Sequence, residues 1–352
     1  MHTSPTTRAA ADATSSALEL ARLIDSYLTT QLLYVAARLG VTDVLADGPR
    51  TGAEVAAAVG ADPAALTRVL RGLTLDGVLA EEDGGRFALT AVGERLREGV
   101  SGSLRAAALA RGELYWSAAA GLLRAVTEGG TAFEHAHGEP FFAHLAADAE
   151  REAAFQASMA DRAQREAADV VAAYDFGGLG ALVDVGGGSG VLLETILRAV
   201  PELRGVLLDR PEAVARARAR LAAAGLDGRA ECVAGDFFDA VPPGADAYLL
   251  SRVLHDWHDA DARRILTTCR AAMPAGARLL VVDAIVPERV HDGPEAVRMD
   301  LHMLILFGAR ERTEAQFAGL LAGAGLHLRR VVATGSPAGL SVLEATVASA
   351  GR

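Results

Sequence analysis

From about residue 181 to the C-terminus, short apolar segments alternate with longer segments of helical periodicity. The apolar segments have the length of strands and are rich in Val and Leu. Strands of this kind that alternate with amphipathic helices form a parallel sheet with helices on both faces. The sequence therefore predicts an α/β domain, with strands over 182–185, 205–208, 230–233, 247–250 and 278–282, helices over 191–200, 211–224, 258–272 and 313–324, and a closing antiparallel pair over 327–333 and 339–347.

The N-terminal part of the chain has a different pattern, that of helices followed by a hairpin. Apolar residues recur at helical spacing over 18–39, and two shorter helices are predicted over 51–59 and from residue 63. The segments 78–80 and 86–89 then flank a turn of Asp and Gly residues. Helix, turn, helix and hairpin in this order predict a winged helix.

The charge of the chain argues against several partners. The formal net charge is −11, whereas proteins that bind nucleic acids or anionic membranes usually carry a basic face. The winged-helix segment 51–76 itself has a net charge of about −1, which is unfavourable for a helix along phosphates. The pattern therefore predicts a packing or dimerisation module, with no nucleic-acid and no membrane partner.

Residues 1–16 are polar and rich in Ala, Thr and Ser, and we expect them to form a disordered tail. They lack the basic start and apolar run of a secretory signal, and no segment approaches the roughly 18 uninterrupted apolar residues of a membrane span. Cys232 and Cys269 have no neighbouring ligand at metal-binding spacing, and the His255/His258 pair has no evident third ligand. These features predict a cytoplasmic protein with reduced thiols and no metal.

A glycine-rich turn follows the first predicted strand, in Asp184-Val185-Gly186-Gly187-Gly188-Ser189-Gly190. Glycines permit a tight turn and let a ligand approach the backbone closely. A dinucleotide-binding loop would have a third glycine where Val191 or Leu193 stands, and a phosphate-binding loop would end in Gly-Lys-Ser or Gly-Lys-Thr. Because ligands bind beyond the carboxyl ends of parallel strands, the turn is predicted to face a ligand of another class.

Two acids follow the second and third predicted strands. Asp209 can accept hydrogen bonds from both hydroxyls of a ribose, because a carboxylate offers two oxygens. Asp236 can accept from an adenine amino group, and a neighbouring phenyl ring can cover the base. Each acid alone could be a helix cap or a loop residue. Together with the glycine turn, they predict a nucleoside ligand at three successive strand ends.

Combined with two later segments, these motifs resemble the signature of the S-adenosylmethionine-dependent O-methyltransferase family, which includes plant phenolic enzymes and bacterial natural-product tailoring enzymes. The motifs are Gly186-Gly187-Gly188, Asp209, Gly235-Asp236-Phe237-Phe238, Leu254-His255-Asp256-Trp257 and Arg310-Glu311-Arg312-Thr313-Glu314. The resemblance covers about residues 17–348. It implies a Rossmann-like class I methyltransferase sheet in a catalytic domain over 176–352, a mainly helical winged-helix dimerisation domain over 17–100, and a helical linker and substrate-pocket region over 101–175.

The resemblance also implies the cofactor, S-adenosyl-L-methionine, with S-adenosyl-L-homocysteine as the product. The family contacts it at the positions of Gly186, Asp209, Asp236, Phe237 and Ser251. Plant members often carry lysine at the position of Ser251, so that residue is a departure.

His255 falls on the family's general base, and Asp283 and Glu311 fall on the two acids that flank it. Plant members use glutamate at the position of Asp283, where aspartate is one methylene shorter. The chemistry fits, because a phenol of pKa about 10 benefits from a base and a histidine near about 6.5 can take its proton. A carboxylate on the far nitrogen would orient the ring.

Four residues match family positions that sandwich a flat acceptor ring, namely Met159, Met299, Met303 and Phe307. Weaker candidates are His302, Trp116, Phe142 and Phe155, the last three in the aromatic region 101–175. The expected partners are therefore a small aromatic hydroxyl substrate and a second copy of the chain. Two alternatives stay open: a relative that uses the same pocket for decarboxylation or hydroxylation, and a ligand-sensing DNA-binding regulator.

Overall fold

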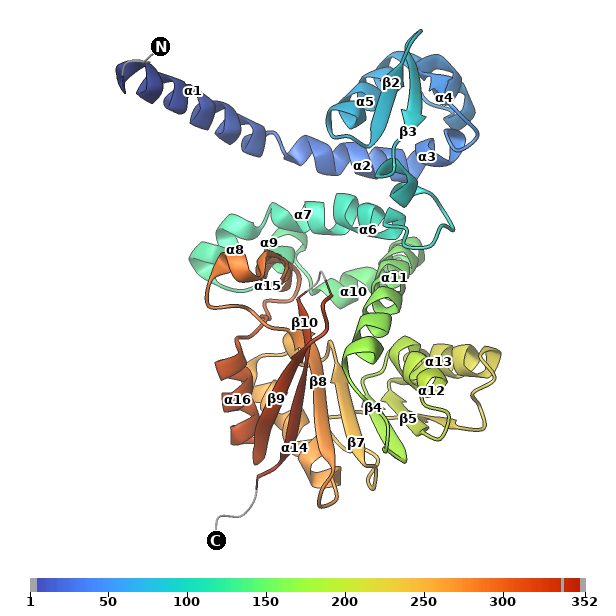
Figure 1. Ribbon diagram of the computed structural model, residues 1–352, viewed down its shortest axis with the longest axis vertical. Coiled ribbons are helices and arrows are strands. Elements are labelled where there is room, and N and C mark those ends of the chain that lie inside the picture. The colour runs from blue at the N-terminus through green and yellow to red at the C-terminus, as the bar shows by residue number, and fades with distance from the viewer. Residues whose placement is uncertain (1–4, 337–338, 349–352) are drawn as a thin grey trace. The chain divides into compact units, whose positions relative to one another are not determined.

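The computed structural model describes residues 5–336 and 339–348 (Figure 1). Its packing divides the chain into two compact units. The first comprises Met1–Trp116 and Ala149–Asp161, and the second comprises Ser117–Asp148 and Arg162–Arg352. The predicted helical region 101–175 is therefore distributed over both units. No helix among the described residues is long and apolar enough to cross a membrane.

The first unit contains the predicted winged helix. Thr51 caps α4 in a reciprocal box with Glu54, and the Asp62 carboxylate caps α5 by accepting from the Ala65 N–H at 2.7 Å. A three-stranded sheet of order β1-β3-β2 follows. The elements are α1 (Pro5–Ile24), α2 (Tyr27–Leu39), α3 (Val41–Val44), β1 (Arg50–Thr51), α4 (Gly52–Val59), α5 (Pro63–Leu75), β2 (Leu79–Glu82), β3 (Arg86–Leu89), α6 (Arg105–Ala110), a π-helical turn (Arg111–Tyr115) and the start of α11 (Ala149–Ala173).

Two expectations for the N-terminus differ from the structure. The single helix predicted over 18–39 is interrupted between α1 and α2, where the Ser26 hydroxyl donates to the carbonyl of Leu23 at 2.7 Å and competes with the helical ladder. Residues 5–16, expected in a disordered tail, lie in α1, in keeping with the high helix propensity of their alanines. Residues 1–4 of that tail lie outside the described residues.

The second unit is built on a seven-stranded sheet of order β6-β5-β4-β7-β8-β10-β9. The strands from β6 to β8 in this order are parallel, and β10 runs antiparallel to both β8 and β9. This arrangement confirms the predicted parallel sheet with its terminal antiparallel pair. The strands are β4 (Ala181–Val185), β5 (Arg204–Asp209), β6 (Ala230–Ala234), β7 (Ala247–Ser251), β8 (Arg278–Ala284), β9 (Leu326–Ala333) and β10 (Leu340–Val347).

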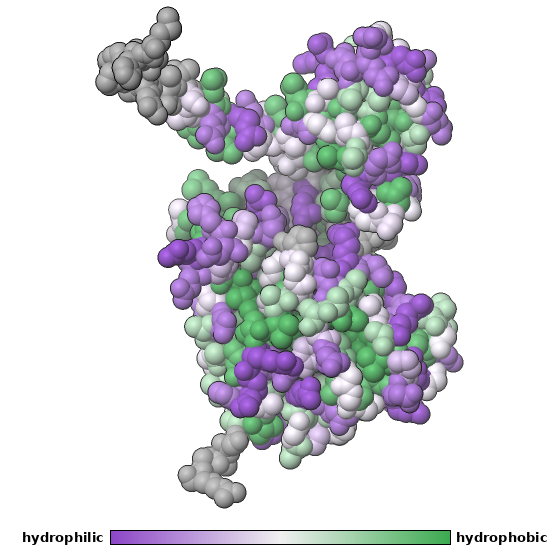
Figure 2. All heavy atoms as spheres, in the orientation of Figure 1, coloured by the Kyte–Doolittle hydropathy of each residue, from purple (hydrophilic) through white to green (hydrophobic). Residues whose placement is uncertain are grey.

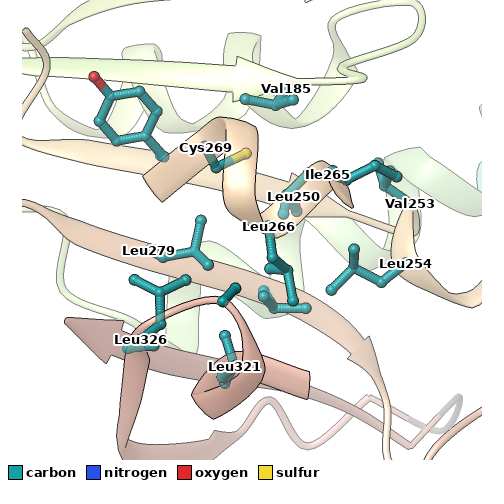
Figure 3. Close-up of a cluster of buried hydrophobic side chains, with 14 of the residues drawn as sticks. Val185, Leu250, Val253, Leu254, Ile265, Leu266, Cys269, Leu279, Leu321 and Leu326 are labelled. Carbon is teal, nitrogen blue, oxygen red and sulfur yellow. The ribbon is translucent and has the colours of Figure 1, made fainter. Parts of the chain in front are cut away.

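Apolar cores lie on both faces of this sheet because alternate strand residues point to opposite sides. Val183 and Val185 belong to the core packed by α14 and α16, of which Figure 3 shows part. Leu182 belongs to the opposite core, packed by α12 and α13. The helices of this unit are α8 (Leu122–Glu128), α9 (Ala132–His137), α10 (Phe141–Ala146), α12 (Val191–Ala199), α13 (Pro211–Ala223), α14 (Asp259–Ala272), α15 (Pro294–Leu306) and α16 (Glu314–Gly323), with α7 (Trp116–Ala119) and α11 shared between the units.

The strand order reverses at β4. From β4 the chain adds β5 and β6 on one side and then returns to add β7 and β8 on the other. The carboxyl ends of β4 and β7 therefore frame a topological switch point, where open α/β sheets bind their ligands.

Candidate active site

The residues singled out in the sequence lie at the carboxyl ends of successive parallel strands. Gly186 follows β4, Asp209 ends β5, Asp236 follows β6, and Ser251 ends β7. Asp283 is the penultimate residue of β8. Since parallel strands end at one edge, the sheet gathers these residues on the same side.

The backbone of the glycine turn packs so closely against neighbouring side chains that a Cβ would not fit at some of its positions. Gly186 has a φ of 73°, and a Cβ there would lie 2.9 Å from the Val253 side chain. Gly188, with a φ of 56°, has open space where its Cβ would stand. The turn is thus packed underneath and open at Gly188, which fits a ligand that lies on the backbone.

Asp209 is fixed by the turn itself. Its Oδ2 accepts a hydrogen bond from the Gly188 N–H at 2.8 Å, and its Oδ1 accepts from the N–H of Arg210 at 2.7 Å. The side chain is half-buried. Each oxygen keeps a lone pair for another donor, so this carboxylate can receive a pair of hydroxyls.

Asp236 and Phe237 complete this side of the sheet. The Asp236 Oδ1 accepts from the Phe238 N–H at 2.8 Å, and the acid is otherwise exposed. The ring of Phe237 lies 3.5 Å from the position of a Cβ on Gly186, and Phe238 packs edge-on against Trp257 with ring centroids 4.8 Å apart. We call the turn 186–190 together with Asp209, Asp236 and Phe237 the glycine edge.

A buried acid beneath the turn was missed by the sequence reasoning. Asp184 is 2 % exposed, and burial, assisted by the charge of nearby Asp209, raises its pKa to about 7. A Cβ on Gly187 would lie 2.5 Å from its Oδ2. The signal was an acid inside an apolar strand, directly before the glycines. Ser251 is half-buried at the end of β7, and its contact with a cofactor stays a prediction.

His255 sits on a 3₁₀ turn after β7, Leu254–Asp256, with 6 % of its side chain exposed. Its Nδ1 lies 2.9 Å from Glu311 Oε1 and 3.4 Å from Asp283 Oδ1. On the other side of the ring, Nε2 lies 3.4 Å from Asp256 Oδ1. The structure therefore brings the three predicted catalytic residues together, and Glu311 is the nearer of the two flanking acids. We call His255, Asp283 and Glu311 the histidine cluster.

Both acids of the histidine cluster have fully buried side chains. Burial raises the pKa of Asp283 to about 6 and that of Glu311 to about 7. The three residues could also be grouped as ligands of a cation. However, the guanidinium of Arg252 already lies 3.4 Å from the Glu311 oxygen that faces His255, and a second cation there would be repelled. The arrangement is suited to holding a proton.

Two side chains that the sequence did not predict, Arg312 and Asp300, hold the segment of Glu311 beside His255. Arg312 is fully buried and donates to the carbonyls of Leu254 and Trp257, each at 2.7 Å, which ties the 3₁₀ turn of His255 to the segment of Glu311. Asp300 on α15 accepts from the Glu311 N–H at 2.9 Å. The sequence showed Arg312 only as part of a motif, and nothing in it marked Asp300.

The acceptor residues are brought together in part. Met299 and Met303 are one turn apart on α15, and Phe307 follows that helix. The Phe307 ring stacks on Phe142 with centroids 5.5 Å apart, and Phe142 is 53 % exposed. Met159 is half-buried on the portion of α11 in the first unit, so its place relative to the others stays a prediction.

Comparisons with known proteins place this geometry in one family. Residues 119–327 match the model of the O-methyltransferase domain, and residues 21–99 match the O-methyltransferase dimerisation domain. The chain is 43 % identical over 329 residues to phenazine O-methyltransferase PhzM of Lysobacter antibioticus, covering 93 % of this chain and 95 % of that protein.

Solved structures agree with the sequence comparisons. Mitomycin 7-O-methyltransferase MmcR superposes with a TM-score of 0.89 at 35 % identity, covering 97 % of this chain and 100 % of the other. NcsB1 is an O-methyltransferase of neocarzinostatin biosynthesis, solved with S-adenosylmethionine and 2-hydroxy-5-methyl naphthoic acid. It superposes with a TM-score of 0.78 at 36 % identity, covering 93 % of this chain and 98 % of the other.

Similar chains do not all share one reaction. Aclacinomycin 10-hydroxylase RdmB of Streptomyces purpurascens is 37 % identical over 346 residues, covering 94 % of this chain and 90 % of that protein. Even so, the matched segments span most of the chain, and they include the parallel strands, the glycine turn and the dimerisation region described above. The chain therefore belongs to the S-adenosylmethionine-dependent O-methyltransferase family, as a methyltransferase domain that follows an O-methyltransferase dimerisation domain.

Proposed function

We propose that the protein methylates a hydroxyl group of a small aromatic molecule, with His255 as the general base. The observation that carries this proposal is the histidine cluster. A carboxylate on Nδ1 at 2.9 Å orients the ring and leaves Nε2 to take a proton from an acceptor hydroxyl. Nε2 would take the proton of that hydroxyl, and Glu311 would stabilise the resulting imidazolium.

The glycine edge fits S-adenosyl-L-methionine. Asp209 would receive the ribose hydroxyls, Asp236 the adenine amino group, and Phe237 would cover the base. Beneath the turn lies Asp184, a buried acid whose Oδ1 has no hydrogen-bond partner among the described residues. When bound, this cofactor supplies an electrophilic methyl group on a sulfonium, and the chain contributes orientation and a base.

Met299, Met303 and Phe307 would hold the aromatic ring of the acceptor. Methionine adapts to ring faces, and the partly exposed Phe142 that stacks on Phe307 offers a flat surface. Support comes from NcsB1, whose structure holds a hydroxylated naphthoic acid. The proposed acceptor class is thus a phenolic or polyketide-like metabolite.

We also propose that the chain acts as a homodimer. The first unit matches a dimerisation domain, and six apolar side chains on α1 and α2 are at least 46 % exposed, namely Leu18, Leu20, Leu23, Ile24, Tyr27 and Leu28. Apolar faces of this extent are typical of protein interfaces. Light scattering of the purified protein should give twice the mass of the chain.

The test is a screen of phenolic compounds for release of S-adenosyl-L-homocysteine, with the methylated product identified by mass spectrometry. We expect product with one additional methyl group on oxygen. Two outcomes would contradict the proposal. Cofactor-dependent loss of carbon dioxide or gain of a hydroxyl would place the chain with its hydroxylase relative, and salt-sensitive binding to duplex DNA would indicate a regulator.

The wing of the first unit argues against the regulator. The tip of the β2–β3 hairpin carries Glu81, Glu82 and Asp83, all exposed. Figure 2 shows hydrophilic residues gathered over this hairpin and the adjacent helices α4 and α5. An acidic wing is repelled by phosphates.

A further inference from the structure

Arg252 is set apart by its backbone. Among residues 5–336 and 339–348 it is the only non-glycine residue with a positive φ, at 57°. This left-handed conformation is unfavourable for a side chain with a Cβ. The Arg252 N–H still donates to the carbonyl of Val282 at 2.9 Å, so the residue stays attached to β8 while its side chain is turned. A conformation of this kind persists where the surroundings hold it in place.

The guanidinium of Arg252 contacts the buried Glu311 and the partly buried Glu166. It donates two hydrogen bonds to Glu166 on α11, from Nη2 to Oε1 at 2.7 Å and from Nε to Oε2 at 3.3 Å. Its Nη1 lies 3.4 Å from Oε1 of Glu311, the same oxygen that lies 2.9 Å from Nδ1 of His255. One carboxylate oxygen is therefore shared between the guanidinium and the ring of the proposed base.

We propose that Arg252 is a positioning residue that favours the ionised form of Glu311 and thereby holds His255 with its ring proton on Nδ1. An ionised Glu311 can only accept a hydrogen bond, so it requires the proton on Nδ1 and leaves Nε2 with the lone pair that takes a proton. A protonated Glu311 could donate to Nδ1, which would place the ring proton on Nε2 and block that nitrogen. This inference rests on the proposed role of His255 as the base.

The surroundings explain why a cation is needed at this position. Glu311 has no exposed side-chain surface, and burial by itself favours its neutral form. Its other oxygen has no hydrogen-bond partner among the described residues. The charged or titratable groups around it are Arg252, His255, Asp283, Asp300, Arg162 and Arg312, with Asp256 on the far side of the ring. The acids in this set oppose ionisation of Glu311, and Arg252, whose Nη1 lies 3.4 Å from its Oε1, favours it.

Glu166 limits the charge that Arg252 presents. Arg162 also contacts Glu166, with Nε 2.8 Å from Oε1, so this acid is shared between two arginines. Removing the charge of Glu166 would leave more positive charge facing Glu311. Substitutions at Arg252 and at Glu166 should therefore shift the ionisation of Glu311 in opposite directions.

The test uses Arg252→Asn, Arg252→Lys and Glu166→Gln. Asparagine tolerates the left-handed backbone, so its effect reports the loss of the guanidinium. The matched control is Arg330→Asn, which removes an arginine paired with Glu344 at 2.8 Å on the antiparallel strands. The ring of His255 is observed by ¹⁵N NMR of histidine-labelled protein and assigned with His255→Ala. The same proteins are assayed for kcat and KM against pH with an acceptor found by the screen.

We expect the neutral ring of the wild type to carry its proton on Nδ1, and that of Arg252→Asn to carry it on Nε2 near neutral pH. The kcat of Arg252→Asn should fall at least about tenfold, while its KM stays within about twofold of the wild-type value. The acidic limb of its profile of kcat against pH should move up by about one to two pH units. Arg252→Lys should recover most of this loss, and Arg330→Asn should match the wild type. In Glu166→Gln the acidic limb of the profile of kcat against pH should move to lower pH.

Three results would overturn the inference: a wild-type ring protonated on Nε2, an Arg252→Asn ring unchanged on Nδ1, or a loss of turnover that is equal at all pH values. If Arg252→Asn does not fold, the opposite shift expected for Glu166→Gln decides the question. The NMR measurement needs no acceptor. Failure of the methyltransferase proposal, seen as no methylated product, is therefore distinguishable from failure of this inference.

Discussion

The glycine edge and the histidine cluster lie on one sheet but handle charge in opposite ways. Asp209 and Asp236 are accessible to solvent and accept hydrogen bonds from backbone N–H groups close by in the chain or in the glycine turn. Asp283 and Glu311 are buried, and the contacts to His255 come from distant segments. Backbone donors and water suit a site that binds and releases a ligand. Burial suits a site that must hold one proton in a defined place.

The largest effect should separate the two regions directly. Because His255 belongs to the histidine cluster alone, His255→Ala should lower turnover about a thousandfold while leaving cofactor affinity unchanged. Steady-state assays and calorimetry with S-adenosyl-L-methionine measure the two quantities. His258→Ala is the control, since His258 is exposed next to the same turn, and it should behave like the wild type. Undiminished turnover in His255→Ala would rule out the base assignment.

Neutralising Glu311 should lower kcat more than neutralising Asp283. Glu311→Gln removes the charge 2.9 Å from Nδ1, whereas Asp283→Asn removes one at 3.4 Å whose oxygens accept no hydrogen bond from the described residues. Glu311→Gln should therefore lower kcat about a hundredfold and Asp283→Asn about tenfold. Single-turnover rates at saturating cofactor provide the measurement. The reverse order would mean that Asp283 orients the ring.

The difference between the regions also explains what could be predicted from the sequence. The glycine edge is encoded locally, because each strand is followed at once by its functional residue, and the sheet and strand order then bring Gly186, Asp209 and Asp236 to one side. Resemblance to a family supplied the histidine cluster, whose closest pair, His255 and Glu311, is 56 residues apart.

The residues that support the histidine cluster could not be predicted, for a physical reason. Arg162 and Glu166 are spaced one helical turn apart, as in an ordinary exposed ion pair, and only the tertiary structure buries them against Arg252. Arg312 looked like one charge among several in its motif. The break between α1 and α2 depends on one serine that hydrogen-bonds the preceding turn, which helical periodicity does not detect.

A smaller effect is expected at the glycine edge. Asp209→Ala removes an acceptor that Gly188 and Arg210 hold in place, so calorimetry should show S-adenosyl-L-methionine affinity reduced about tenfold to a hundredfold. At saturating cofactor kcat should stay within about threefold of the wild type, because the histidine cluster is intact. Asp239→Ala, at an exposed acid of the neighbouring loop after β6, is the control. Unchanged affinity would refute the ribose role.

The smallest effect is expected at Asp184, which lies beneath the glycine turn and is buried like the acids of the histidine cluster. Burial raises the pKa of Asp184 from 3.8 to about 7, so the folded chain keeps a proton that the unfolded chain releases. Stability from this group is complete below the unfolded pKa and is lost as pH rises through the folded one. Asp184→Asn removes that loss, so its Tm should exceed the wild-type value by a few degrees at about pH 8 and match it at about pH 4.

Calorimetric scans without cofactor measure this difference, and Asp227→Asn, at an exposed position, should leave Tm unchanged at both pH values. A gain in Tm that is the same at both pH values would mean that Asp184 is ionised throughout. A gain confined to high pH would instead show that the buried Asp184 keeps its proton in the folded chain.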